Sequence, residues 1–109
     1  MDSLIQCIYT SSSTVDFREH EIPTLLEAAR LKNARLGVTG ILLYIGGNFL
    51  QVLEGESLDV SALYGAIVRD SRHARVKEIS RRRIVTREFP DWHMGFCALE
   101  RRNAGELLV

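Results

Sequence analysis

Residues 37–55 read GVTGILLYIGGNFLQVLEG, which is the pattern of two apolar strands joined by a glycine turn. Strands as apolar as these are normally buried on both faces of a sheet. Gln51 shares a pleat face with Phe49 and Leu53, so we expect its side chain to point into a covered environment. Left unpaired there, its amide would cost about 1–3 kcal/mol. Some protein or ligand group must therefore hydrogen-bond Gln51.

The composition indicates one globular domain without a strong charge. A chain of 109 residues buries about two thirds of its unfolded surface, which is enough for a core. Its 14 acidic and 14 basic residues leave no net field to attract nucleic acid or an anionic membrane. No basic region followed by an apolar run opens the sequence, and its apolar runs are too short to span a bilayer. We expect a cytoplasmic protein with no nucleic-acid or membrane partner.

A strand and a helix are expected before the hairpin. Residues 4–9 are apolar on both faces, which indicates a central strand, and the polar residues 10–14 are expected to end it. The helix is expected to begin near Pro23 and to end at Gly37, as proline and glycine do at helix starts and ends. Asn33 falls on the apolar face of this helix if the helix persists that far.

A second helix and two further strands are expected after the hairpin. Ser57 is the expected N-cap of the helix, and Asp70 falls on the helix's apolar face near its end. Residues 76–86 form a mostly polar strand, which is typical of a sheet edge, and residues 92–99 form a fifth strand. Residues 100–109 are a C-terminal extension that would start a helix or pair with another chain.

The order of these elements predicts an α+β fold of the ferredoxin-like class. We expect a βαββαββ arrangement with a five-stranded mixed sheet and both helices packed on one face. A right-handed crossover is expected to place the first and third strands side by side and parallel. Tyr9 and Gln51 would then be neighbours.

Polar groups recur where an apolar core is expected, at Tyr9, Asn33, Gln51 and the segment 70–73. Taken singly, a buried tyrosine, a helix-end asparagine and a histidine near a helix C-terminus have ordinary structural explanations. Together they surround the space between the helices and the central strands. Two carboxamides suit a planar ligand whose rim alternates donors and acceptors. The apolar walls would come from Leu25, Ala29, Leu63 and Ile67. A heteroaromatic ring fits this space, and the spacing leaves open which one.

Several short motifs occur in a fixed order along the chain. They are Ile8-Tyr9-Thr10-Ser11, Asn33, Val38-Thr39-Gly40-Ile41-Leu42-Leu43-Tyr44, Asn48-Phe49-Leu50-Gln51-Val52-Leu53-Glu54-Gly55, Asp70-Ser71-Arg72-His73 and Phe89-Pro90-Asp91-Trp92-His93-Met94-Gly95. Single motifs of this kind are loose, but the ordered set is specific. The sequence closely resembles the BLUF family of blue-light-sensing flavin domains over essentially its whole length. We therefore expect residues 1–99 to form such a domain.

The resemblance implies noncovalently bound FAD, with the isoalloxazine ring between the two helices. Asn33 would bind the pyrimidine edge of the ring, and Leu25 and Ile67 would sandwich it. Lys32 stands where many members carry Asn or His, and it offers a point charge to a phosphate. Three of the residues, Asp70, Arg72 and His73, would lie on the ribityl and dimethylbenzene side. The full set of flavin-binding residues that the resemblance implies is Leu25, Arg30, Lys32, Asn33, Phe49, Gln51, Ile67, Asp70, Arg72 and His73.

The resemblance also implies a photocycle without net chemistry. Tyr9 would give an electron and a proton to the excited flavin, and Gln51 would lie between them as the relay. Gln51 would end rotated or tautomerised, with a stronger hydrogen bond to the flavin carbonyl and a red-shifted spectrum. Its new partners would move Trp92 or Met94, which the resemblance implies are the signalling pair of the fifth strand. The signal would pass to a separate effector protein or through a homo-oligomer, and the chain itself would not be an enzyme.

Two other functions compete with this interpretation. The first is an acylphosphatase-like hydrolase that uses Asn33 and an arginine, which is disfavoured because residues 10–14 contain no glycine-rich phosphate loop. The second is a flavin-free interaction module in which Gln51 is simply satisfied by Tyr9.

Basic, histidine and cysteine residues add no further function. Residues 81–83 and Arg87 are basic, but on an edge strand a charged run more often blocks pairing with another sheet. No ligand spacing joins the three histidines to cysteines or carboxylates, so we predict no metal site. Cys7 and Cys97 lie in separate apolar runs, which favours two buried thiols over a disulfide.

Overall fold

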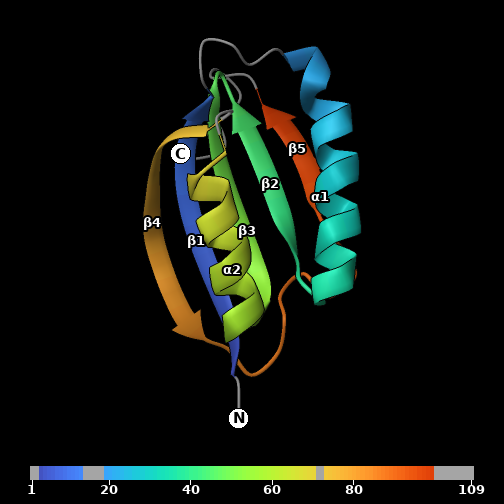
Figure 1. The fold of residues 1–109 in the computed structure, drawn as a ribbon, viewed down its shortest axis with the longest axis vertical. Helices are drawn as coiled ribbons and strands as arrows, with labels where there is room; N and C mark the ends of the chain where they lie inside the picture. The colour runs from blue at the N-terminus through green and yellow to red at the C-terminus, as the bar shows by residue number, and fades with distance from the viewer. Residues whose placement is uncertain (1–2, 14–18, 71–72, 100–109) are drawn as a thin grey trace.

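A five-stranded mixed sheet carries two helices on one of its faces (Figure 1), as predicted. The computed structural model describes residues 3–13, 19–70 and 73–99. The elements are β1 (Leu4–Ser13), a short 3-10 helix η1 (Glu19–Glu21), α1 (Ile22–Leu36), β2 (Thr39–Ile45), β3 (Asn48–Glu56), α2 (Ser57–Val68), β4 (His73–Arg83) and β5 (Gly95–Leu99). The strand order is β4-β1-β3-β2-β5, so β1, β3 and β2 form the centre of the sheet. The predicted ferredoxin-like class is confirmed.

The hairpin of β2 and β3 forms as the sequence predicts. Gly46 and Gly47 have φ angles of 51° and 90°, and a two-residue turn of this hand requires positive φ at both positions. The turn sets the register, which pairs Tyr44 with Phe49 and Leu42 with Gln51. Gln51 therefore lies in the middle of a central strand.

The central strand β1 lies between β4 and β3 and is antiparallel to both. The expectation that the first and third strands are parallel is wrong. The crossover through α1 makes β1 parallel to β2 and leaves room for one strand between them. Because β3 folds back from the hairpin into that space, it runs against both neighbours. The expected proximity is confirmed, since Tyr9 and Gln51 are direct register partners.

Strand ends differ from the sequence prediction where pairing partners decide them. β1 continues through the expected terminator to Ser13, because Ser11 and Ser12 still pair with β3. β4 covers residues 73–83 rather than 76–86, because it pairs along the length of β1. β5 begins at Gly95, where its ladder with β2 starts, and not at residue 92. The polarity of the residues along a strand does not show where its neighbouring strand stops pairing with it.

The two helices begin and end near the expected residues. Proline stands in the first turn of α1, and Gly37 ends the helix with φ 67°. The Gly37 N–H bonds to the Ala34 carbonyl, which satisfies one of the last carbonyls of the helix. Asn33 is 1 % exposed on the buried side of α1. In α2 the expected N-cap Ser57 is the first helical residue, and Glu56 holds the cap position without a side-chain bond.

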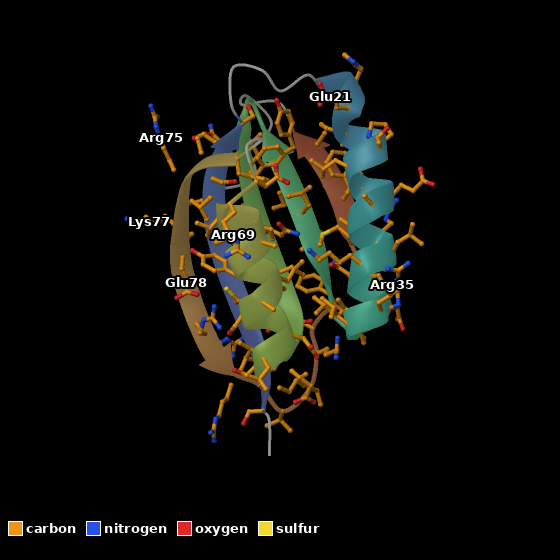
Figure 2. All side chains as sticks on the ribbon, viewed as in Figure 1. Glu21, Arg35, Arg69, Arg75, Lys77 and Glu78 are labelled. Carbon is orange, nitrogen blue, oxygen red and sulfur yellow. The ribbon has the colours of Figure 1, made fainter. Side chains whose placement is uncertain are left out.

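The two cysteines have different surroundings. Cys7 is fully buried on β1, and burial raises the pKa of its thiol to about 11. Cys97 is exposed, because β5 is an edge strand, so the expectation of a second buried thiol is wrong. The other edge is β4, and Figure 2 shows Arg75 and Lys77 pointing away from the sheet there. This matches the prediction of a charged edge strand.

Gly40 is the glycine with the least room. A Cβ atom at this position would lie 1.8 Å from the Val52 carbonyl oxygen on the neighbouring strand. We expect Gly40→Ala to lower the free energy of unfolding by about 3 kcal/mol or more, because backbone must move to admit the methyl group. Urea denaturation measures this change.

Gly65→Ala is the matched control. A Cβ at Gly65 would meet only the flexible Arg69 side chain, at 3.4 Å. Replacing a glycine inside α2 is expected to raise stability by about 0.5–1 kcal/mol. Equal urea midpoints for the two variants would contradict the close packing of β2 on β3 at Gly40.

Candidate functional site

A cavity of about 320 Å³ lies between the two helices and the central strands. Its size is within the range of about 300–1,000 Å³ that is common for small-molecule sites. The lining residues come from α1, α2, β2, β3 and the segments that lead into β4 and β5. They are Leu25, Ala28, Ala29, Lys32, Asn33, Leu42, Gln51, Leu63, Ala66, Ile67, Asp70, His73 and Met94. The space expected from the sequence is therefore present.

Helical spacing brings the walls of the cavity together. Leu25 and Ala29 on α1, and Leu63 and Ile67 on α2, stand one helical turn apart on the faces that line the cavity. The sequence prediction did not include Ala28, Leu42 and Ala66. Two of them precede predicted wall residues, and Leu42 is the register partner of Gln51, so the hairpin pairing contained the signal for it.

Gln51 lies on the cavity surface at the centre of β3 and is 7 % exposed. Its amide nitrogen donates to the sulfur of Met94 at 3.4 Å. A thioether sulfur is a weak acceptor. The side chain therefore has little hydrogen-bond energy to lose if another partner enters the cavity.

Tyr9 lies opposite Gln51 on β1 and is fully buried. Within the described part of the chain, its hydroxyl is the buried polar side-chain atom that has no hydrogen-bond partner. Its ring meets Tyr64 edge to face, with 5.4 Å between centroids. Burial raises the pKa of Tyr9 above its usual value, so the hydroxyl stays protonated. The flavin-free alternative expected Tyr9 to satisfy Gln51, and the structure does not contain that bond.

Asn33 connects the cavity to the segment before β5. Its side-chain nitrogen donates to the carbonyl of His93, while its side chain also lines the cavity. One turn earlier, Arg30 donates from Nε to the carbonyl of Met94 at 2.9 Å. Arg30, a predicted flavin-binding residue, does not line the cavity and instead lines the neighbouring groove beside β5.

Trp92 and Met94 occupy opposite environments. Met94 is 3 % exposed and lines the cavity, whereas Trp92 is 52 % exposed and lies in a groove beside β5. Both residues precede β5, so their expected placement within the fifth strand is wrong. The structure is therefore an arrangement with methionine inside and tryptophan outside.

The remaining predicted residues divide into three groups. Lys32, Asp70 and His73 line the cavity, and the Nδ1 atom of His73 lies 2.9 Å from the Ser11 hydroxyl. Phe49 does not line the cavity and packs behind it, with its ring 5.0 Å from that of His73. Arg72 falls outside the described residues, as do residues 100–109.

Features that could have indicated other functions are accounted for locally. Arg81 pairs with Glu78 at 2.8 Å, and Arg82 pairs with Glu88 at 3.1 Å, so two of the basic residues are engaged in ion pairs on the surface. No group of three or more His, Cys, Asp or Glu side chains that could hold a metal lies within residues 3–13, 19–70 and 73–99. Within the same ranges, each helix is too short or too polar to cross a bilayer.

The fold and the cavity define an α+β domain with a small-molecule-sized site, lined by two buried carboxamides, one of which is the register partner of a buried tyrosine that does not itself line the cavity. The family model that matches the chain is that of the BLUF domain, described as sensors of blue light using FAD, and it covers residues 4–95. The chain belongs to this family of flavin-based blue-light sensors.

Named relatives and solved structures agree with this assignment. The chain is 32 % identical over 94 residues to the photoactivated adenylate cyclase subunit beta of Euglena longa, covering 84 % of this chain and 11 % of that protein. The dark-state structure of BlrB, a BLUF protein, superposes with a TM-score of 0.86 at 34 % identity, over 98 % of this chain and 80 % of that one. Klebsiella pneumoniae BlrP1, solved with FMN and cyclic diGMP, superposes with a TM-score of 0.81 at 34 % identity, over 96 % of this chain and 29 % of that one.

Most of each curated relative lies beyond the region of similarity. The chain spans about a tenth of the length of the Euglena cyclase subunits that it matches. What is shared is the sensor domain.

Proposed function

We propose that this chain is a blue-light photoreceptor module that holds FAD in the cavity between α1 and α2. The observation that carries the proposal is the unpaired, buried hydroxyl of Tyr9, which stands opposite Gln51. An unsatisfied buried hydroxyl costs about 1–3 kcal/mol, so the site has a reason to admit a ligand or to switch partners. The weak sulfur acceptor of Gln51 supports the same conclusion.

The residues present fit an isoalloxazine ring. Leu25 and Ile67 come from opposite helices and supply apolar walls. Asn33 and Gln51 supply the donors and acceptors that match the polar edge of the ring. Lys32 is exposed yet lines the cavity, so its ammonium would offer a point charge to a phosphate of the cofactor.

FAD is proposed over FMN, although one structural neighbour was solved with FMN. The description of the family as using FAD supports this choice. Chromatography of the flavin released by denaturation identifies which one is bound.

The protonation and hydrogen bonding of the chain's own residues support the proposed mechanism. When bound and excited by blue light, the flavin supplies a strong one-electron oxidant. Tyr9 would be the donor of the electron and the hydroxyl proton that the excited flavin takes up, and its raised pKa keeps the proton on the hydroxyl until then. Gln51 rotates or tautomerises and releases the Met94 sulfur. Both the electron and the proton would return from the flavin to Tyr9, so the cycle would leave a changed hydrogen-bond pattern and no net chemistry.

The output is a change at the segment that leads into β5. Met94 loses its bond to Gln51, and the residues around it repack. A two-state hydrogen bond that biases a packed segment is a conformational switch. We propose that a separate effector protein or a second copy of the chain reads this change, and that any enzymatic output lies in that partner.

An absorption spectrum before and after blue light tests the proposal. After incubation with excess FAD and removal of the free cofactor, the purified protein is expected to show a flavin spectrum. Illumination should shift this spectrum slightly to the red, and the shift should reverse in the dark. Protein that stays colourless, or a flavin spectrum that does not move, would overturn the proposal.

A further inference from the structure

The connection between β4 and β5 carries both Trp92 and Met94, and we call residues 84–94 the strap. The backbone carbonyls of its last three residues each accept a hydrogen bond from β2 or α1. The Trp92 carbonyl accepts from the Gly40 N–H at 2.8 Å, and the carbonyls of residues 93 and 94 accept from the α1 side chains described above. The end of the strap is therefore attached to β2 and α1.

The middle of the strap is bound by a buried carboxylate. Glu54 on β3 is 0 % exposed. Its two oxygens accept from the backbone N–H groups of Glu88 at 3.1 Å and Phe89 at 2.8 Å, and one of them also accepts from the Gln6 amide at 2.9 Å. Arg87 adds a bond to the backbone carbonyl of Glu54 at 3.0 Å. A buried charge is tolerated only with such a full set of donors.

Glu54 and Gln51 lie on opposite faces of the same strand, because they are three residues apart. Gln51 contacts the cavity, and Glu54 holds the strap that returns Met94 to that cavity. The central strand β3 therefore carries both the proposed switch residue Gln51 and the carboxylate of Glu54. We call the bonds from this carboxylate to the N–H groups of residues 88 and 89 the clamp.

A direct path of contacts leads from the clamp to Trp92. The N–H of Phe89 is bound by Glu54, and the Phe89 ring stacks near Trp92 at 6.2 Å between centroids. Trp92 also packs so closely on Gly95 that a Cβ there would lie 2.7 Å from the indole. Phe89 therefore connects Glu54 to the exposed Trp92.

We propose that Glu54 is a positioning residue that holds the strap with Met94 inside the cavity and Trp92 outside it. Loss of the clamp would let the strap exchange the two side chains more readily. The lifetime of the light state would then shorten, and this second part rests on the proposed photoreceptor function.

Glu54→Gln in the FAD-loaded protein tests the proposal with three readouts. An amide at this position presents a donor to one of the two backbone N–H groups, so one bond of the clamp is lost. The readouts are hydrogen exchange at residues 88 and 89, acrylamide quenching of fluorescence, and the rate of dark recovery. Trp92 is the single tryptophan of the chain, so the quenched signal is tryptophan emission excited at a wavelength that tyrosine does not absorb, and it reports the strap. Glu56→Gln is the matched control, because it makes the same change two residues away at an exposed position without a side-chain cap bond.

For Glu54→Gln we expect exchange protection at residues 88 and 89 to fall by about tenfold, as the loss of a charge-assisted hydrogen bond predicts. Trp92 should become less accessible to acrylamide, and dark recovery should accelerate by about tenfold. Glu56→Gln should match the wild type in all three. Unchanged protection, or lost protection with quenching and recovery within about twofold of the wild type, would overturn the proposal.

Arg87→Gln is the second variant if Glu54→Gln does not fold. It removes the bonds to the Glu54 carbonyl at 3.0 Å and to the Thr39 hydroxyl at 2.9 Å, and it should change the three readouts in the same direction by a smaller factor. Wild-type values for all three would overturn the proposal here too. Failure of the photoreceptor function itself would appear as a wild-type protein without a light-induced shift. Exchange and quenching would still decide whether Glu54 positions the strap.

Discussion

Gln51→Leu is expected to abolish the light-induced red shift while the protein still binds flavin. Leucine fills nearly the same volume in this covered site but cannot donate or accept a hydrogen bond. The cavity keeps its apolar walls and Asn33, so flavin affinity should fall by about tenfold or less, the value of one hydrogen bond. Light-minus-dark difference spectra measure the shift, and flavin titration measures the affinity.

The other glutamine of the chain provides the matched control. Gln6 is also buried in a central strand, at 3 % exposure, but it bonds to Glu54 on the opposite face of the sheet. Gln6→Leu should therefore lower stability and keep the red shift. A normal shift in Gln51→Leu, or loss of the shift in both variants, would remove Gln51 from its proposed role.

Tyr9→Phe is expected to act in opposite directions on stability and on the light response. Without flavin, the variant removes a buried hydroxyl that has no partner, so the free energy of unfolding should rise by about 1 kcal/mol. With flavin, the variant lacks the phenol that we propose as the electron and proton donor, so the red shift should be lost. Urea denaturation of the flavin-free protein and difference spectra of the loaded protein measure the two effects.

Tyr64→Phe separates the hydroxyl of Tyr9 from the aromatic packing around it. The Tyr64 ring would keep its edge contact with Tyr9, and only a hydroxyl from a half-buried ring would be lost. We expect a normal shift in this variant. A shift that survives in Tyr9→Phe but disappears in Tyr64→Phe would show that the wrong tyrosine was assigned as the donor.

The parts of the fold that the sequence predicts are those that local pattern encodes. The glycine turn and two apolar strands fix the hairpin, and helical spacing places Asn33 on the buried side of α1. Gln51 is conspicuous because a polar residue interrupts a strand that is otherwise apolar. For the same reason the cavity between the helices could be anticipated from the four polar positions.

Features that depend on distant partners could not be read from the sequence in this way. The antiparallel pairing of β1 with β3 follows from which strand fills a gap, and the ends of β4 and β5 follow from their ladder partners. The contact between Glu54 and the strap was missed, because it is made with backbone N–H groups more than thirty positions away, at residues 88 and 89. The alternation that places Gln51 on one face also places Glu54 on the other, so the signal for its orientation was present.

The contrast between the two cysteines makes the unmodified chain convenient for optical measurement. Cys7 is enclosed and its pKa is about 11, so a maleimide dye at neutral pH would react with Cys97 alone. Cys97 lies on β5 in the same groove as Trp92, three positions after Met94. The Trp92 indole and a dye on the Cys97 thiol would flank Met94 in sequence, and the emission of each depends on its surroundings in this groove. The proposed repacking around Met94 could therefore be followed optically at Trp92 and Cys97 without introducing a new residue.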